Sequence, residues 1–176
     1  VEMYFGKSCI YGDDRPNEFQ YEHIYDLITK NIFFVYPKDI APTPEYIKER
    51  FLELIIKEKV EFCMIDPFNQ MTNEYARSGG RSDKYLETLL SDFRRFARVN
   101  EIYFIIVAHP KALQKKPDGN YPCPDVFDIA DGAMWNNKMD NILVYHLPYR
   151  QTDQFSNVCE FHSKKIRRRK VVGNIG

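Results

Sequence analysis

Short apolar segments alternate with amphipathic segments along this 176-residue chain, and this alternation limits its fold more than any other feature. Helical spacing of apolar side chains is clearest in residues 41–59 and 82–100. The short apolar runs cover residues 31–37, 60–66, 102–110 and 141–148. Strands that alternate with helices form βαβ units, so we expect an α/β fold with a mostly parallel sheet and helices on both faces.

The remaining segments complete this pattern. Residues 20–30 are expected to form a helix, residues 125–140 a short helix or turn, and residues 158–172 a final strand or hairpin. Thr43 is placed to cap the helix of residues 41–59, and Pro44 suits its first turn. A loop with a Gly79-Gly80 pivot follows the second apolar run.

Composition excludes several classes of protein. Lys plus Arg and Asp plus Glu both number 25, so the net charge of zero predicts no general attraction to nucleic acid or membranes. No apolar run approaches the roughly 20 residues of a membrane span. The four cysteines are far apart and form no C-x-x-C pair, which argues against zinc and favours reduced thiols. Cys63 is expected to be a small core residue.

Asp66 ends a buried apolar run, "FCMID". A carboxylate held at the end of a strand, the Walker B arrangement, can orient the water shell of a magnesium ion beside nucleotide phosphates. The alternative is an Asp that only caps the following turn.

His109 repeats this construction one βα unit later, in "IIVAHP". Ligands of parallel α/β sheets bind at the carboxyl ends of the strands, so His109 and Asp66 are expected at the same edge. The imidazole could hydrogen-bond a γ-phosphate, or it could simply bond a neighbouring carbonyl group.

The segment "DIADGAMWNNKMDNILV" carries a third candidate site. Small residues at Ala130, Gly132 and Ala133 allow a close approach of the backbone, for example to a phosphodiester. Stacking and hydrogen-bonding groups follow at Trp135, Asn136, Asn137 and Lys138. The alternative is a helix that packs through its small face, with Trp135 in the core.

Lys or Arg occupies six of the nine positions from His162 to Lys170. Such a segment can lie across phosphates, either of DNA or of a nucleotide in a neighbouring subunit. The alternative is a solvated basic edge strand that prevents aggregation.

The phosphate-binding motif G-x-x-x-x-G-K-[ST] does not occur in the sequence. "FGKSC", residues 5–9, contains Gly-Lys-Ser but lacks the first glycine of the motif, and no apolar strand precedes it. We therefore interpret it as a chance match.

Taken in order, these segments resemble the ATPase domain of replicative DNA helicases of the DnaB and Twinkle type, especially phage and prophage primase-helicases. The resemblance extends from about residue 33 to the end of the chain. It rests on "FCMIDPFNQ", "KYLETLLSDFRRFARVNEIYFIIVAHP", "DIADGAMWNNKMDNILV" and "KKIRRRKVVGNIG". It implies a RecA-like P-loop NTPase fold.

The resemblance also implies roles for individual residues. Asp66 looks like the Walker B acid, which holds Mg²⁺ through water, and His109 resembles the sensor on the following strand. The segment from Asp128 to Ala133 is similar to the loop that faces single-stranded DNA in the hexamer channel. Lys165 and Arg167 look like a pair inserted into the ATP site of the adjacent subunit, with Arg167 as the arginine finger.

The family's phosphate-binding loop and catalytic glutamate would precede Val1, so residues 1–176 are expected to be one partial domain, truncated at its N-terminal side. The full-length protein is then expected to be a hexameric helicase that uses ATP and Mg²⁺ on single-stranded DNA, in the cytoplasm of a bacterium or as a phage or prophage protein. This chain alone is expected neither to bind ATP tightly nor to hydrolyse it. The alternatives are a RecA-like binding or assembly module without activity, and a recombinase or clamp loader.

Overall fold

The computed structural model describes residues 2–9, 15–37, 42–71, 81–173 and 175, in two compact units, Val1–Lys38 and Asp39–Gly176. The glycine pivot predicted at residues 79–80 lies outside the described residues. The prediction that residues 1–176 form one partial domain stays a prediction.

The first unit contains helices α1, Glu2–Phe5, and α2, Glu18–Asn31. Asn17 and Gln20 begin α2 with a capping box: Gln20 N donates to Asn17 Oδ1 (2.9 Å), and Asn17 N donates to Gln20 Oε1 (3.0 Å). The helix predicted over residues 20–30 is confirmed.

The strand predicted over residues 31–37 is wrong. Residues 32–37 follow α2 without forming a helix or strand, and they pair with no strand among the described residues. An apolar run alone does not make a strand, because the backbone N–H and C=O groups of a strand need a neighbouring strand as partner. Phe34 and Tyr36 consequently remain 85% and 82% exposed.

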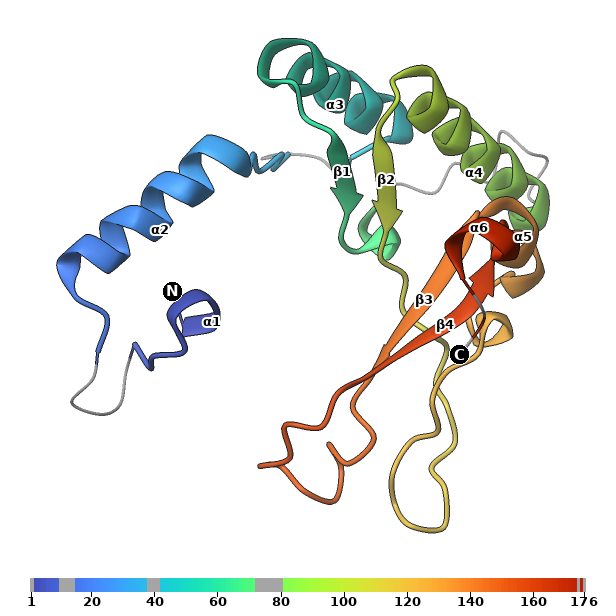
Figure 1. The fold of residues 1–176 in the computed structure, drawn as a ribbon. Coiled ribbons are helices and arrows are strands. Elements are labelled where there is room, and N and C mark those ends of the chain that lie inside the picture. Colours follow the sequence, from blue (N-terminus) through green and yellow to red (C-terminus); the bar gives the residue numbers. More distant parts are fainter. Residues whose placement is uncertain (1, 10–14, 38–41, 72–80, 174, 176) are drawn as a thin grey trace. The chain divides into compact units, whose positions relative to one another are not determined.

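The second unit contains the remaining helices and all four strands of the described chain (Figure 1). Its α-helices are α3, Pro44–Glu58; α4, Ser82–Val99; α5, Gly132–Lys138; and α6, Arg169–Val172. Its strands are β1, Phe62–Ile65; β2, Tyr103–Ile106; β3, Asn141–His146; and β4, Glu160–Ile166. The described residues of this unit also form two short 3₁₀ helices, η1, Phe68–Gln70, and η3, Val126–Asp128.

Helix α3 begins as predicted. The Thr43 side chain accepts a hydrogen bond from Tyr46 N (3.2 Å), and Pro44 lies in the first turn. Ile47 and Phe51 of its predicted apolar face are buried.

Strands β1 and β2 pair in parallel, with Phe62 opposite Tyr103 and Ile65 opposite Ile106. Helices α3 and α4 cover one face of this pair (Figure 1). Phe104 of β2 is the centre of that packing, since its ring lies 5.8 Å from Phe51 of α3 and 5.0 Å from Phe93 of α4. Together with the buried Cys63 and Ile65, these rings fix the two strands against both helices.

Cys63 is a core residue, as the sequence predicted. It is 3% exposed, and burial raises the pKa of its thiol to about 11. No disulfide bond links the cysteines of the described residues.

Strands β3 and β4 form a separate antiparallel pair, with Tyr145 opposite Phe161. The described strands therefore form one parallel and one antiparallel pair instead of one mostly parallel sheet. The α/β class is confirmed, as is the parallel pairing of the second and third predicted strands. Strands that follow one another in the chain are often neighbours in a sheet, and β4 returns along β3 after the long connection of residues 147–159.

In the part of the chain that the structure describes, no helix is long and apolar enough to cross a membrane.

The ion pair between Lys48 of α3 and Asp92 of α4 offers a test of how these helices are held. Arg95 Nη2 also lies 2.8 Å from Asp92 Oδ1. Burial raises the pKa of the Asp92 carboxyl, but its bonds to Lys48 and Arg95 outweigh burial and keep that pKa below its usual value.

Asp92→Asn is therefore expected to lower the free energy of unfolding by about 1 kcal/mol at neutral pH. The loss should disappear as the pH falls below about 3.9 and through the lower pKa of the folded state, because the wild-type carboxylate is then protonated too. Denaturant unfolding between pH 7 and pH 3 measures both effects. Glu53→Gln, which removes the exposed pair with Arg50 within α3, is the control and should change stability by less than about 0.5 kcal/mol. An Asp92→Asn loss that is unchanged at pH 3 would contradict this assignment.

Candidate functional site

Backbone hydrogen bonds at Val107 align the carboxyl ends of β1 and β2. Val107 N donates to Ile65 O (2.9 Å), and Val107 O accepts from Phe68 N (2.8 Å). These two bonds continue the parallel ladder past β1 and turn the chain into η1. The residues that follow each strand are consequently fixed at one edge of the strand pair, as the sequence predicted.

Asp66 and His109 both occupy this edge. Asp66 directly follows β1, and His109 comes three residues after β2. Both side chains are exposed, and neither makes a hydrogen bond or ion pair with a described residue. The alternative readings, a turn cap for Asp66 and a carbonyl partner for His109, therefore find no support among the described contacts.

Asp66 suits a magnesium ion that is coordinated mainly by nucleotide phosphates and water, with a single carboxylate from the protein. The residues described here contain no cluster of three or more His, Cys, Asp or Glu that could hold a metal. Mg²⁺ in phosphate sites keeps several waters and needs only one or two carboxylates beside the phosphates. An exposed carboxylate without a cationic partner at a strand end suits that kind of site.

The chain beyond His109 returns to the segment predicted to face DNA. Lys111 N donates to Asp128 O (2.7 Å), which ties this connection to η3. The Asp128 carboxylate accepts from Asp125 N (2.6 Å), so it caps the turn of η3. The side chain of Asp128 is thus engaged within the chain.

Gly132 permits a close contact, but the contact is with this chain itself. A Cβ atom at Gly132 would lie 2.6 Å from Val126 O and 2.7 Å from Phe127 Cα. Trp135 is only 4% exposed, donates from Nε1 to Ala130 O (3.2 Å), and packs edge-on against Phe68 at 5.0 Å. Trp135 is therefore a core residue and cannot stack on a base, so the structure supports the alternative that the sequence left open, a packed helix with Trp135 in the core.

The other predicted DNA-facing residues differ in their surroundings. Ala130 and Ala133 are exposed, whereas Lys138 Nζ pairs with Glu87 Oε1 of α4 at 2.9 Å. The proposed contacts with DNA stay a prediction for all of these residues.

The C-terminal end of α5 is contacted by two side chains from another part of the chain, Lys165 of β4 and Arg167 directly after β4. Lys165 Nζ donates to Asn136 O, and Arg167 Nη2 donates to Asn137 O at 3.0 Å. Cationic groups are favourable here because the last carbonyl groups of a helix carry partial negative charge. Burial lowers the pKa of Lys165, and the positive charge of Arg167 lowers it further, while Asp140 opposes both effects.

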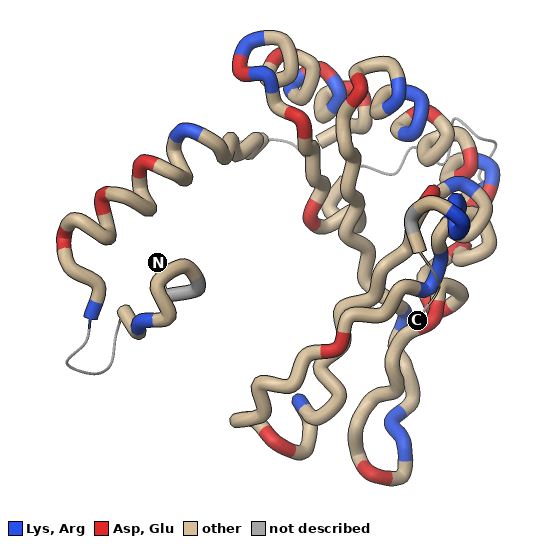
Figure 2. The backbone as a smooth tube through the Cα atoms, in the orientation of Figure 1, with Lys and Arg blue, Asp and Glu red and all other residues tan. Residues whose placement is uncertain are grey.

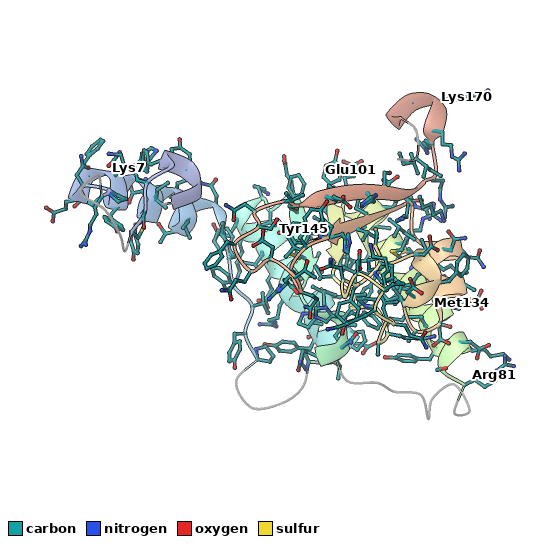
Figure 3. All side chains as sticks on the ribbon, turned by 90° about the horizontal axis from the view of Figure 1, so that it is seen from below. Lys7, Arg81, Glu101, Met134, Tyr145 and Lys170 are labelled. Carbon is teal, nitrogen blue, oxygen red and sulfur yellow. The ribbon has the colours of Figure 1, made fainter. Side chains whose placement is uncertain are left out.

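Arg167 also joins a network of charges. Its Nε lies 2.6 Å from Asp140 Oδ1, and Arg94 Nη2 of α4 lies 3.0 Å from the same oxygen. These contacts hold the end of β4 against α4 and α5, and Lys and Arg positions follow one another from the end of β4 into α6 (Figure 2). Lys170 on α6 lies away from the packed side chains (Figure 3).

The Gly-Lys-Ser segment near the start of the chain does not have the surroundings of a phosphate-binding loop. Phe5 ends helix α1, so a helix precedes Gly6 where the phosphate-binding motif requires a strand. This agrees with the interpretation of a chance match.

A known protein and a solved structure are similar to this chain. The chain is 28% identical over 139 residues to a Twinkle homolog protein, chloroplastic/mitochondrial, of Arabidopsis thaliana, covering 78% of this chain and 19% of that protein. Its fold matches the solved structure of an ATPase domain with a TM-score of 0.69 at 15% identity, over 99% of this chain and 59% of that chain. No protein-family profile matches the chain.

The resemblance to DnaB/Twinkle-type helicase ATPase domains is confirmed. The chain spans about a fifth of the length of the Twinkle homolog and less than two thirds of the solved ATPase-domain chain.

The sequence analysis did not predict the charge network around Arg167. Glu87 and Arg94 lie seven residues apart on α4, outside its apolar stripe, and each pairs with a residue at the end of α5. Their spacing places both on one side of α4. Their partners are 51 and 46 residues away in the chain, so no local pattern predicts the pairing.

Gly132→Ala tests the close packing at the start of α5. Helix propensity alone predicts that alanine stabilises this position by up to about 1 kcal/mol. The contacts with Val126 and Phe127 predict the opposite, a loss of about 1–3 kcal/mol, because backbone atoms cannot move aside cheaply. Thermal or denaturant unfolding measures the difference, with the exposed Ala133→Ser as a control that should change stability by less than about 0.5 kcal/mol. A stabilised Gly132→Ala variant would contradict the packing seen here.

Proposed function

We propose that this chain is part of an ATP-dependent replicative DNA helicase, or of a primase-helicase, that assembles as a hexameric ring. The observation that carries the proposal is the exposed, unpaired carboxylate of Asp66 at the aligned ends of two parallel strands. The resemblance to helicase ATPase domains supports it, because the same position would hold the Walker B acid.

In this proposal ATP is the substrate, and Asp66 holds Mg²⁺ through water. The bound Mg²⁺ supplies charge neutralisation for the phosphates. The chain itself contains no G-x-x-x-x-G-K-[ST] motif, so another segment of the whole protein provides the phosphate-binding loop. His109, at the same edge, hydrogen-bonds the terminal phosphate and senses its loss.

Lys165 and Arg167 act on the ATP bound by a neighbouring subunit. An arginine that approaches the transferring phosphoryl group stabilises charge in the transition state. Because the arginine comes from a second subunit, hydrolysis depends on assembly. The basic end of β4 and α6 supports this role, since it concentrates cationic side chains that a phosphate can attract.

Single-stranded DNA is the proposed ligand of the segment from Asp128 to Ala133 and of Lys138. The exposed Ala130 and Ala133 leave room for a sugar-phosphate backbone close to the main chain. Translocation along DNA would follow from movement of this segment as ATP is hydrolysed. Such a protein would work in the cytoplasm of a bacterium or during phage replication.

The proposed whole domain has a RecA-like, mostly parallel sheet with helices on both faces. The face of β1 and β2 opposite α3 and α4 supports this, because it is apolar yet open. Its side chains, with their exposed fractions, are Phe62 (60%), Met64 (53%), Tyr103 (67%) and Ile105 (41%). So much apolar surface in a sheet is normally covered.

Arg167→Ala in the full-length protein is expected to lower kcat for ATP hydrolysis by about 10³-fold with little change in KM, because the arginine acts in the transition state. Steady-state ATPase kinetics with single-stranded DNA present measure both constants. Arg168→Ala removes the adjacent exposed arginine and is the matched control, with kcat expected within about twofold of wild type.

Two results would contradict the proposal. A slow Arg168→Ala variant beside a normal Arg167→Ala variant would refute the assignment of the finger. A full-length protein that assembles on DNA without any ATP turnover would instead indicate a binding or assembly module.

A further inference from the structure

Asp140 lies between two arginines from different elements. Arg94 of α4 contacts both oxygens of its carboxylate, with Nη2 3.0 Å from Oδ1 and Nε 3.2 Å from Oδ2. Arg167, which follows β4, places Nε 2.6 Å from Oδ1. Arg167 N also donates to Asp140 O (2.9 Å), so the backbone and the side chain of Asp140 both hold Arg167.

This arrangement fixes the plane of the Arg167 guanidinium. Nε is bound to Asp140, while Nη2 donates to the carbonyl oxygens of Asn137 (3.0 Å), Met139 (3.4 Å) and Lys138 (3.5 Å). Nη1 donates to none of the residues that the structure describes. One edge of the guanidinium is therefore held by the chain, and its other end stays available.

We propose that Asp140, itself oriented by Arg94, is the positioning residue that presents Arg167 to the nucleotide of the neighbouring subunit. This inference rests on the proposed role of Arg167 as a finger supplied in trans. An arginine side chain has many rotamers, and a catalytic group must be held close to its productive geometry before the reaction begins. A bidentate carboxylate between two guanidinium groups selects one orientation.

The carboxylate also balances charge. Without it, Arg94 and Arg167 would face each other, with Lys165 close by at the same helix end. Like charges at this separation repel, so the Arg167 side chain would turn towards solvent and lose its fixed orientation. Asp140→Asn removes the charge while keeping the shape of the side chain.

The test measures ATP hydrolysis by the full-length protein with Asp140→Asn, Arg167→Ala and both together. Asp140→Asn is expected to lower kcat roughly tenfold, with KM for ATP changed less than about twofold, because positioning of Arg167 matters only in the transition state. In the Arg167→Ala background, Asp140→Asn should have no further effect on kcat, since there is then no guanidinium to position. Asp140→Glu should restore part of the rate.

Asp92→Asn is the matched control, because Asp92 also lies between two cationic side chains, Lys48 and Arg95, but away from Arg167. It should lower stability and leave kcat unchanged.

A normal kcat for Asp140→Asn beside a slow Arg167→Ala overturns the positioning role alone. The positioning role is also overturned if Asp140→Asn slows the Arg167→Ala enzyme as much as the wild type. A normal kcat for Arg167→Ala refutes the proposed finger, and the role of Asp140 with it.

Discussion

The parallel register of β1 and β2 is the constraint on which the candidate site depends. Two backbone hydrogen bonds at Val107 continue the ladder past β1 and place Asp66 and the chain leading to His109 at one edge. The register in turn depends on Phe104, whose ring packs against α3 and α4 together. A slip of one residue would turn Phe104 to the open face and remove both the core and the alignment of the strand ends.

Helix α5 connects the two other parts of the proposed site. At its start, Gly132 packs directly on the backbone of η3, within the segment proposed to face DNA. At its end, carbonyl oxygens and Asp140 hold Lys165 and Arg167. In the proposed function, this seven-residue helix joins the segment proposed to contact DNA to the proposed arginine finger.

Local sequence patterns predicted the local parts of this structure well. The helix cap at Thr43, the buried strand with Cys63 and the strand end at Asp66 all depend on neighbours within a few residues. The strand predicted at residues 31–37 did not form, because pairing requires a distant partner strand that a local apolar run cannot specify. The charge network of Arg94, Asp140 and Arg167 was missed for the same reason, since its members are dozens of residues apart.

The most direct test of a site shared between subunits is to mix two inactive full-length proteins, Asp66→Ala and Arg167→Ala. A subunit with intact Asp66 can then receive an intact Arg167 from its neighbour. If the arginine acts in trans, the mixture will hydrolyse ATP faster than the sum of the two separate proteins, and the gain will require co-assembly. A mixture that assembles but shows no gain would contradict the account.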